Sequence, residues 1–454
     1  MRALITSALA LTAAAGAGFA DDWPQWRGPY GTGVSTDKGL PTRWSRDEVA
    51  WKTRLGGLGI SSPIVWGDRV FVTSQAGRGT LKPGQHPTLA RGDEASAERP
   101  LGAGSSTEAD AARIEFLVEA FDRKDGRRIW QYRLAAEGDL PEVHQKHNLA
   151  SPSPVTDGHL VYAWFGNGQL VALRLDGKLA WQRHLGREYT PFEINWGHGS
   201  SPTLYEDILI LLCDHHPASY LLALDKKTGR ERWKVDRPKG SISYSTPTVV
   251  RGPRGDEMIV NSTTRIDAYD PRSGEALWWT GESHRFAVPV PAYHDGVLYL
   301  SRGYRSGPYL AVRTGGRGDV SKTHVPWSVP TGAPYVSSLL HYEGLIYMAN
   351  DSGIVTCVDP GTGEKVWQER ISGIFTASPI GADGRVYLVS ETGETIVLQA
   401  GREPRLLARN SIGERSVATP AVSGGQIFIR TDDHLICVGV LVPEGAPKAA
   451  LGSP

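Results

Sequence analysis

The chain lacks the features that indicate a disulfide scaffold, a nucleic-acid-binding face or a membrane-spanning domain. Its 454 residues include three cysteines, an odd and small number that predicts no disulfide framework. Lysine plus arginine and aspartate plus glutamate number 49 each, so no basic surface for nucleic acid is indicated. Beyond residue 20 no apolar run reaches the length of a membrane-spanning helix. The chain is instead rich in glycine (53), proline (30) and tryptophan (14), which is typical of short strands joined by tight turns.

The first twenty residues predict a cleaved secretory signal. Arg2 precedes an apolar, alanine-rich run that ends in small residues at Gly18 and Ala20. This order of charge, apolar run and small residues is that of a signal peptide with its cleavage site. No cysteine lies near the predicted cut, so a bacterial lipid anchor is not expected. We therefore expect an exported protein, either periplasmic or secreted.

One spaced pattern recurs along the chain. Residues 223–233 read Ala-Leu-Asp-Lys-Lys-Thr-Gly-Arg-Glu-Arg-Trp, and the spacing Ala/Cys-x-Asp-x3-Gly-x3-Trp returns at 120–130, 268–278 and 357–367. In each match two short strands flank a polar turn. The turn's polar side chains can hydrogen-bond the backbone, and its glycine can adopt a positive φ. An internal repeat of this kind predicts a repeat architecture.

Each repeat begins with a Ser-Pro or Thr-Pro step, or an equivalent, followed by alternating strands. Eight such starts lie at 62, 153, 201, 246, 290, 338, 378 and 419. With four strands apiece they predict an all-β, eight-bladed β-propeller of four-stranded antiparallel blades. Residues 49–52 read as a final strand without its partners, and the last repeat lacks its own final strand. We therefore expect the N-terminal strand to complete the last blade and close the ring.

The propeller is expected over residues 44–440. A signal peptide (1–20) and an irregular aromatic segment (21–43) precede it, and a tail (441–454) follows it. Blade 1 carries a long insertion over 75–113, rich in glycine, proline, alanine and serine. A loop of this length is usually either functional or disordered, and both interpretations stay open.

The unit Ala-x-Asp-x-x-Thr-Gly-x-x-x-Trp, with its Ser-Pro strand start, resembles the PQQ-like (pyrrolo-quinoline quinone) repeat family of β-propellers. The resemblance covers residues 44 to about 439. It implies that the repeat tryptophans are structural and that most of them pack against the neighbouring blade. The tryptophans in the repeat position are Trp51, Trp130, Trp181, Trp233, Trp278, Trp327 and Trp367.

Two branches of this family imply different functions. Quinoprotein dehydrogenases bind PQQ with Ca²⁺ on the propeller axis, and their larger alcohol-oxidising members carry an adjacent pair of cysteines. This chain has no Cys-Cys step and no recognisable Glu/Asn/Asp calcium set, so no ligand set supports PQQ with calcium. The other branch holds non-catalytic propellers, including the lipid-anchored BamB-like assembly factors, which bind partners through loops on one face.

The loops that enter the first strand of each blade should meet at one mouth of the ring. Alignment of the strand starts places His198 and Tyr335 there, four residues before the proline or its equivalent. In the stretch Trp196-Gly-His198-Gly, the glycines would let a ligand reach the histidine and stack on the tryptophan. The other interpretation is that His198 hydrogen-bonds a neighbouring blade within a plugged channel.

Histidines are concentrated in the sector that contains His147, Asp214 and His215. Seven of the thirteen lie between residues 144 and 216. The chain has no Cys-x2-Cys or His-x3-His spacing, so no metal site is predicted. Asp214 and His215 would make an acid–base pair, but no nucleophile motif such as Gly-x-Ser-x-Gly accompanies them.

These patterns predict a monomeric, non-catalytic binding or scaffold protein of the cell envelope. Its loop-rich face would take a protein partner, or a small molecule or glycan, and not nucleic acid. The alternative is a quinoprotein-type or metal-dependent oxidoreductase with its site at the propeller mouth. A third hypothesis is carbohydrate binding by the aromatic residues Trp196, Tyr304 and Tyr335.

Overall fold

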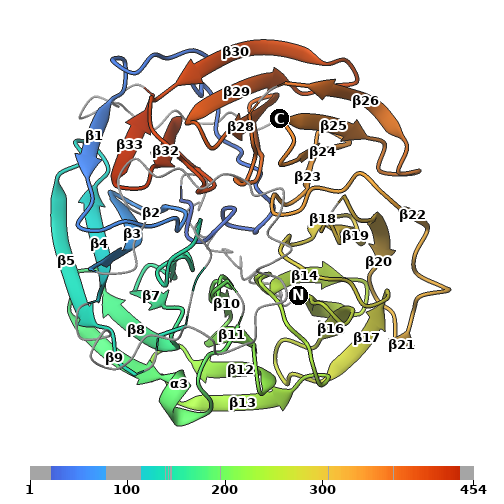
Figure 1. Cartoon of the computed structure of the whole chain (residues 1–454), viewed down its shortest axis with the longest axis horizontal. Coiled ribbons are helices and arrows are strands. Elements are labelled where there is room, and N and C mark those ends of the chain that lie inside the picture. The colour runs from blue at the N-terminus through green and yellow to red at the C-terminus, as the bar shows by residue number, and fades with distance from the viewer. Residues whose placement is uncertain are drawn as a thin grey trace, which may run out of the picture.

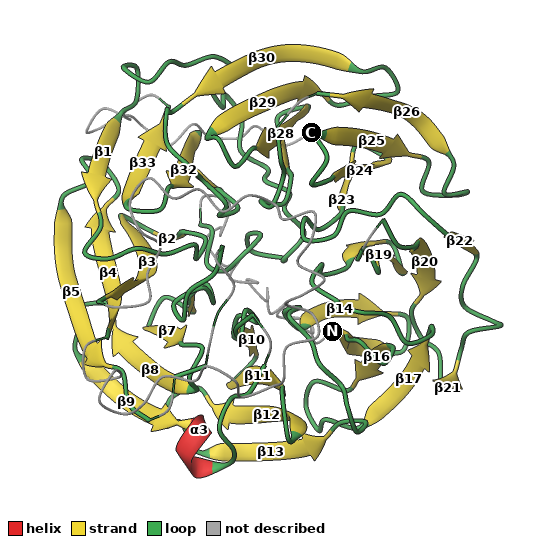
Figure 2. Ribbon diagram, viewed as in Figure 1, coloured by secondary structure: helices red, strands yellow, loops and turns green. Residues whose placement is uncertain are grey.

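A computed structural model describes residues 22–77, 114–138, 140–141, 143, 146–194, 196–304, 306–371 and 373–439. Eight β-sheets follow one another around a central axis, as Figures 1 and 2 show. The predicted all-β, eight-bladed propeller is therefore confirmed. The predicted signal peptide, residues 78–113 of the predicted insertion, and the C-terminal tail lie outside the described residues.

The first four blades contain consecutive antiparallel strands. Blade 1 consists of β2 (Ile64–Trp66), β3 (Arg69–Ala76), β4 (Glu115–Asp122) and β5 (Arg128–Ala135). Blade 2 consists of β6 (Val155–Thr156), β7 (Leu160–Trp164), β8 (Gln169–Arg174) and β9 (Leu179–His184), after which comes a short helix, α3 (Leu185–Glu188). Blade 3 consists of β10 (Thr203–Tyr205), β11 (Ile208–Asp214), β12 (Ser219–Asp225) and β13 (Glu231–Asp236). Blade 4 consists of β14 (Thr248–Gly252), β15 (Gly255–Asn261), β16 (Ile266–Tyr269) and β17 (Ala276–Thr280).

The remaining blades include two departures from this order. Blade 5 consists of β18 (Ala292–His294), β19 (Val297–Ser301), β20 (Tyr309–Arg313) and β22 (Trp327–Val329), and its extra strand β21 (Gly318–Asp319) pairs with β17 of blade 4. Blade 6 consists of β23 (Leu340–Tyr342), β24 (Leu345–Ala349), β25 (Ile354–Val358) and β26 (Lys365–Arg370). Blade 7 consists of β27 (Ile380–Ala382), β28 (Arg385–Val389), β29 (Glu394–Gln399) and β30 (Arg405–Ser411). Blade 8 consists of β31 (Ala421–Ser423), β32 (Gln426–Arg430), β33 (His434–Val438) and the N-terminal strand β1 (Trp51–Arg54), which pairs with β33.

The Asp-x-x-Thr-Gly turn of the repeat, which we call the Asp-Thr-Gly turn, makes contacts within its own blade and with the preceding blade. In blade 3, Asp225 Oδ1 accepts hydrogen bonds from the backbone N–H of Thr228 at 2.9 Å and from its hydroxyl at 2.8 Å. Gly229 follows with φ +70°, and a Cβ there would lie 2.7 Å from the ring of Trp181 in blade 2. Trp181 Nε1 donates to the carbonyl of Lys226 at 3.0 Å. The turn therefore shapes its own blade and receives the tryptophan of the preceding one.

Four other repeat tryptophans make the same hydrogen bond from the indole N–H to a carbonyl of the next blade. The pairs are Trp51 with Arg123, Trp130 with Leu175, Trp327 with Pro360, and Trp367 with Gly401. Trp233 contacts Gly274 of blade 4, but its buried indole N–H has no hydrogen-bond partner among the described residues. Trp278 packs with apolar residues of blade 5, yet its indole N–H donates to Glu257 of its own blade at 2.7 Å. Blade 5 lacks the Asp-Gly turn that would otherwise accept this hydrogen bond.

The strand-start hydroxyls form a belt of hydrogen bonds between blades. Each bond joins a backbone N–H at one strand start to the serine or threonine hydroxyl of the following blade, at 2.9–3.1 Å. The pairs are Ser62 with Ser153, Ser153 with Ser201, Ser201 with Thr246, Val290 with Ser338, Ser338 with Ser378, and Ser378 with Thr419. Val290 has no hydroxyl and so cannot accept a bond from blade 4. The Ser-Pro element therefore joins neighbouring blades near the axis.

The N-terminal segment crosses the axis before it joins blade 8. Trp23 pairs with Val65 of blade 1, and the carbonyl of Pro24 accepts from Thr156 of blade 2 at 2.9 Å. Arg27 is fully buried and donates to the carbonyl of Leu339, beside blade 6, at 2.7 Å. These contacts lie toward the face that carries the turns between the first and second strands. The segment thus covers one end of the axis.

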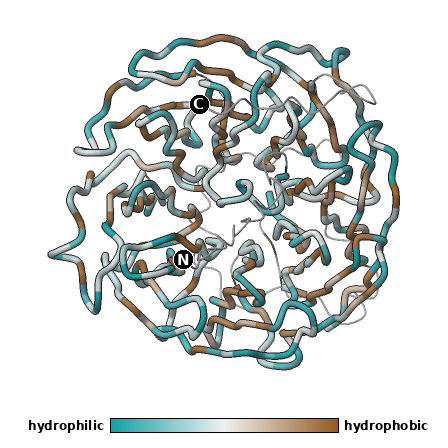
Figure 3. Tube along the Cα trace, turned by 180° about the vertical axis from the view of Figure 1, so that it is seen from behind, coloured by the Kyte–Doolittle hydropathy of each residue, from teal (hydrophilic) through white to brown (hydrophobic). Residues whose placement is uncertain are grey.

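Apolar side chains are concentrated between the blades. Clusters of buried residues join each blade to its neighbour, and the three cysteines are buried among them as free thiols. Figure 3 shows hydrophobic stretches throughout the ring of blades. In the part of the chain that the structure describes, no helix has the length and apolar character needed to span a bilayer.

Candidate functional site

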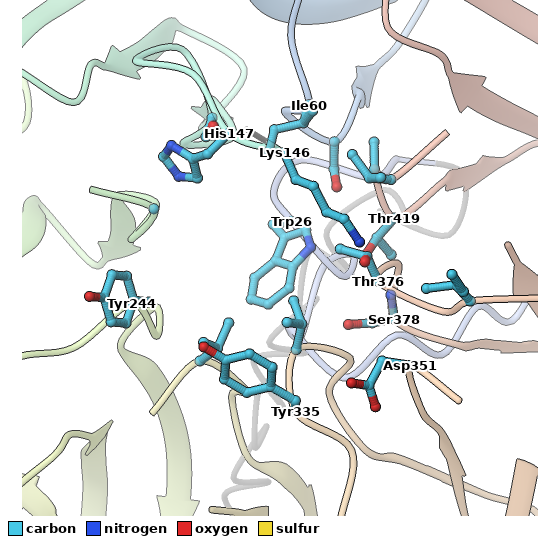
Figure 4. A pocket seen from close by; sticks show the side chains of 18 of the residues that line it. Trp26, Ile60, Lys146, His147, Tyr244, Tyr335, Asp351, Thr376, Ser378 and Thr419 are labelled. Carbon is cyan, nitrogen blue, oxygen red and sulfur yellow. Dashed lines mark hydrogen bonds between the residues drawn. The ribbon is translucent and has the colours of Figure 1, made fainter. Parts of the chain in front are cut away.

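A cavity of about 1210 Å³ lies on the propeller axis. Most of its lining residues come from the loops that enter the first strands and from those that join the second and third strands. Both sets of loops lie on the face opposite the N-terminal segment. Trp26 belongs to that segment and lines the cavity. Figure 4 shows its indole between Lys146 and Tyr335.

Five aromatic residues form one wall, which we call the aromatic ladder: Tyr244, Trp196, Phe286, Tyr304 and Tyr335. The rings of Trp196 and Phe286 meet edge to face with centroids 4.3 Å apart, and those of Phe286 and Tyr304 with centroids 4.7 Å apart. Tyr335 continues the series 5.2 Å from Tyr304, and Tyr244 lies 6.2 Å from Trp196. All of these residues except Phe286 line the cavity. Four rings from several consecutive blades therefore face the cavity, and Phe286 packs between two of them.

Backbone strain accompanies two residues of the ladder. Trp196 has φ +70° and Phe286 has φ +54°, in the left-handed region that bulky residues rarely adopt. Such a conformation costs about 1–3 kcal/mol and persists where surrounding contacts impose it. The edge-to-face contact of these two rings is therefore accompanied by strained backbone in the loops before blades 3 and 5.

His147 lines the cavity next to the glycines of the Trp196-Gly-His198-Gly stretch. A Cβ at Gly197 would lie 2.7 Å from His147 Nδ1, and one at Gly199 would lie 3.3 Å from its Nε2. Small residues are therefore required here because the imidazole of His147 packs against this backbone. The sequence had suggested that these glycines admit a ligand to His198.

An ionic group lies on the wall opposite the ladder. Lys146 Nζ is 2.8 Å from Glu391 Oε1, and both side chains are more than nine-tenths buried. The hydroxyl of Thr376 donates to the same carboxylate. Burial lowers the pKa of Lys146, while the carboxylate of Glu391 raises it in part. Asp351 lines the cavity nearby. The charges on this wall are therefore of both signs.

His198 is buried away from the cavity lining. Its ring lies 4.3 Å from that of Trp164 and 5.3 Å from that of Phe192, and its Nε2 donates to the carbonyl of Leu212 at 3.1 Å. Burial lowers the pKa of His198 from its ordinary value of 6.5 to about 3. The imidazole is therefore uncharged at neutral pH.

Asp214 and His215 have separate partners. Asp214 Oδ1 accepts from Arg237 Nε at 2.7 Å in a fully buried ion pair. Burial raises the pKa of Asp214 to about 6, although Arg237 opposes this shift. His215 stacks on Phe192 with centroids 4.1 Å apart, and burial lowers its pKa to about 4. Of the predicted site residues, the cavity thus brings together His147, Trp196 and Tyr335, whereas His198, Asp214 and His215 belong to the packing of blade 3 and its neighbours.

The carboxylates at the cavity do not resemble a calcium site. Ca²⁺ takes 6–8 oxygen ligands, mainly from carboxylates and carbonyls. Among the described lining residues, Asp351 is the one carboxylate. Glu391, which is not a lining residue, is bound by Lys146 and Thr376. This donor set does not fit PQQ held with a resident Ca²⁺. Elsewhere, Glu414, Asp433 and His434 lie close enough to share a cation, but Glu414 is already paired with a lysine and a threonine.

Comparison with known proteins agrees with the repeat and the fold. A family model described as "Outer membrane protein assembly factor BamB" matches residues 33–190, 114–286, 262–401 and 351–439. The chain belongs to this family. The predicted PQQ-like repeat propeller, with distant similarity to BamB and to the quinoprotein dehydrogenases, is thereby confirmed.

Three relatives show how far the similarity extends. The chain is 21% identical over 339 residues to the outer membrane protein assembly factor BamB of Yersinia pestis, which covers 74% of this chain and 72% of that protein. The BamB structure from Moraxella catarrhalis is 14% identical with a TM-score of 0.57, over 88% of this chain and 100% of that one. The quinohemoprotein alcohol dehydrogenase of Comamonas testosteroni is 13% identical with a TM-score of 0.63, over 96% and 82%. Similarity at this level to the solved structures shows the fold alone.

Several residues of the cavity were not singled out from the sequence. Trp26 lies in the segment 21–43, which was predicted to be irregular and aromatic, but nothing in its pattern placed it on the axis. Lys146 is next to the predicted His147, and its partner Glu391 is 245 residues away. Tyr244 lies two residues before the Thr-Pro step of blade 4. Its position in a strand-start loop was the one available signal.

Proposed function

We propose that this chain is an exported, non-catalytic binding protein of the cell envelope, which holds a protein partner on its loop-rich face. The observation that carries this proposal is the asymmetry of the two ends of the axis. Residues 22–35 cover one end, whereas loops of successive blades surround a cavity at the other. Loops on a rigid scaffold are the usual location of binding residues.

The chemistry of the cavity supports binding more than catalysis. Lys146 is paired with Glu391. The buried His198 donates to the backbone carbonyl of Leu212, and the buried Asp214 is paired with Arg237. The hydroxyl of Thr376 donates to the carboxylate of Glu391, but Lys146 already neutralises that carboxylate, which makes it a weak base for activating a nucleophile. Membership of a family described as an outer membrane protein assembly factor favours a protein as the partner.

Site-specific photo-crosslinking in the envelope of the source organism tests this proposal. The full chain would carry benzoylphenylalanine in place of Ser352, an exposed residue at the mouth of the cavity. The matched control places the same group at Tyr30, whose side chain is 74% exposed on the segment that covers the other end of the axis. We expect a discrete protein adduct from position 352 and none from position 30. Adducts from position 30 alone, or from neither position, would contradict the proposal.

A further inference from the structure

We propose that the axial cavity is a binding site for a neutral oligosaccharide, which stacks on the aromatic ladder and hydrogen-bonds to the polar wall opposite. This ligand is additional to the protein partner proposed above and does not depend on it. The proposal combines three observations: the spacing and strain of the ladder, the paired charges across from it, and the hydrogen bonds already made by the inner strands.

The ladder has the form that an extended ring polymer requires. Its rings follow one another at centroid separations between 4.3 and 6.2 Å, on loops that belong to blades 3 to 6. Each pyranose ring has an apolar C–H face that can lie on an aromatic side chain and a rim of hydroxyl groups that needs polar partners. A strained φ at Trp196 and at Phe286 helps to fix the surface before any ligand arrives.

The wall across from the ladder offers hydrogen bonds without an excess of either charge. Lys146 is held by Glu391, and Thr376 donates to that same carboxylate. Arg370 Nη1 donates to the backbone carbonyl of Ser352 at 2.8 Å, next to Asp351 in the chain. Fixed groups of both signs suit uncharged hydroxyls, which can donate to carboxylates and accept from ammonium and guanidinium groups. A strongly anionic or cationic ligand would meet both attraction and repulsion here.

The inner strands are poorly suited to an extended peptide that adds a β-strand. Such a peptide binds by hydrogen bonds to the N–H and C=O groups of an open sheet edge. At the belt, the backbone N–H groups of Ser62, Ser153, Ser201, Ser338 and Ser378 already donate to hydroxyls of the following blades. Side-chain contacts therefore have to provide the recognition. This condition favours stacked sugar rings over a paired peptide strand.

Isothermal titration calorimetry with defined hexasaccharides tests the proposal. The probes are cellohexaose, maltohexaose and N-acetylchitohexaose, each titrated into the purified chain, with decaproline as a peptide that could use the same aromatic rings. We expect saturable binding of at least one hexaose. Tyr335→Ala and Trp196→Ala should each weaken it about tenfold or more, because each removes one stacking ring. Tyr335→Phe keeps the ring and should lose less than Tyr335→Ala. Tyr30→Ala, on the other face, should bind like the wild type.

Each outcome decides the proposal. Binding of none of the three hexaoses by the wild type, with its fold verified by circular dichroism, would overturn it, as would binding that both ladder variants retain. Binding of decaproline without any hexaose would assign the ladder to a protein ligand and overturn the carbohydrate proposal. The crosslinking experiment at position 352 tests the proposed protein partner independently. A negative result in calorimetry would therefore overturn the oligosaccharide proposal without affecting that one. If one ladder variant does not fold, the other still gives the comparison.

Discussion

Acidification should destabilise the fold through His198, a histidine that burial keeps uncharged. Its pKa is lowered from 6.5 to about 3. A lowered folded-state pKa means that, below the unfolded pKa, the unfolded chain binds the proton more readily. The stabilisation is therefore complete above about pH 6.5 and is lost as the pH falls toward 3. Between about pH 7 and pH 5 this single group should remove about 2 kcal/mol from the free energy of unfolding.

The contribution of His198 can be separated from those of other groups by substitution. His215, with its pKa lowered to about 4, adds a loss of similar size. The raised pKa of Asp214 acts in the opposite sense, because its protonated form is favoured in the folded state. The glutamine of His198→Gln does not titrate, and its amide can still donate to the carbonyl of Leu212. The difference between this variant and the wild type therefore isolates one imidazole.

Urea-induced unfolding at the two pH values, followed by tryptophan fluorescence, measures the effect. We expect the wild type to lose about 2 kcal/mol more than His198→Gln on acidification. The matched control is the same substitution at an exposed histidine, His159→Gln, with which the His198 variant is compared. If His198→Gln and the wild type lose the same stability, His198 is not the buried, neutral group that the structure describes.

Two further predictions concern the repeat. Gly229→Ala should lower the free energy of unfolding by about 1–3 kcal/mol more than Gly240→Ala, measured by urea unfolding. Both glycines have a positive φ, but only at Gly229 would the added Cβ contact a neighbour, the ring of Trp181 at 2.7 Å. An equal loss of stability in the two variants would show that the ring of Trp181 moves aside at little energetic expense, and would contradict this prediction. Trp278→Phe should cost about 1.5–3 kcal/mol more than Trp233→Phe, because only the first indole donates a hydrogen bond, here to a buried carboxylate. A larger loss for Trp233→Phe in the same assay would contradict this account.

Part of the candidate site could be predicted from the sequence, because the repeat gives the position of a residue around the propeller. Tyr335 was placed at the mouth by its distance from a strand start, Trp196 as the neighbour of the aligned His198, and His147 as part of the histidine-rich sector. All three line the cavity. His198 holds the same aligned position as Tyr335, yet its ring lies between aromatic side chains of the blade packing. Alignment gives the place of a residue around the ring. The direction of its side chain depends on how each irregular loop packs.

The repeat in the sequence was enough to predict the number of blades, the polar turn and the positive φ of the turn's glycine. These features depend on hydrogen bonds within a few residues and on one contact that every repeat makes with the next, so periodicity is enough to specify them. Tertiary structure alone decided that Trp26 lies on the axis, that Lys146 meets Glu391 across 245 residues of chain, and that five aromatic rings form one wall. Those contacts join segments outside the repeat, and only closure of the ring brings them within reach of one another.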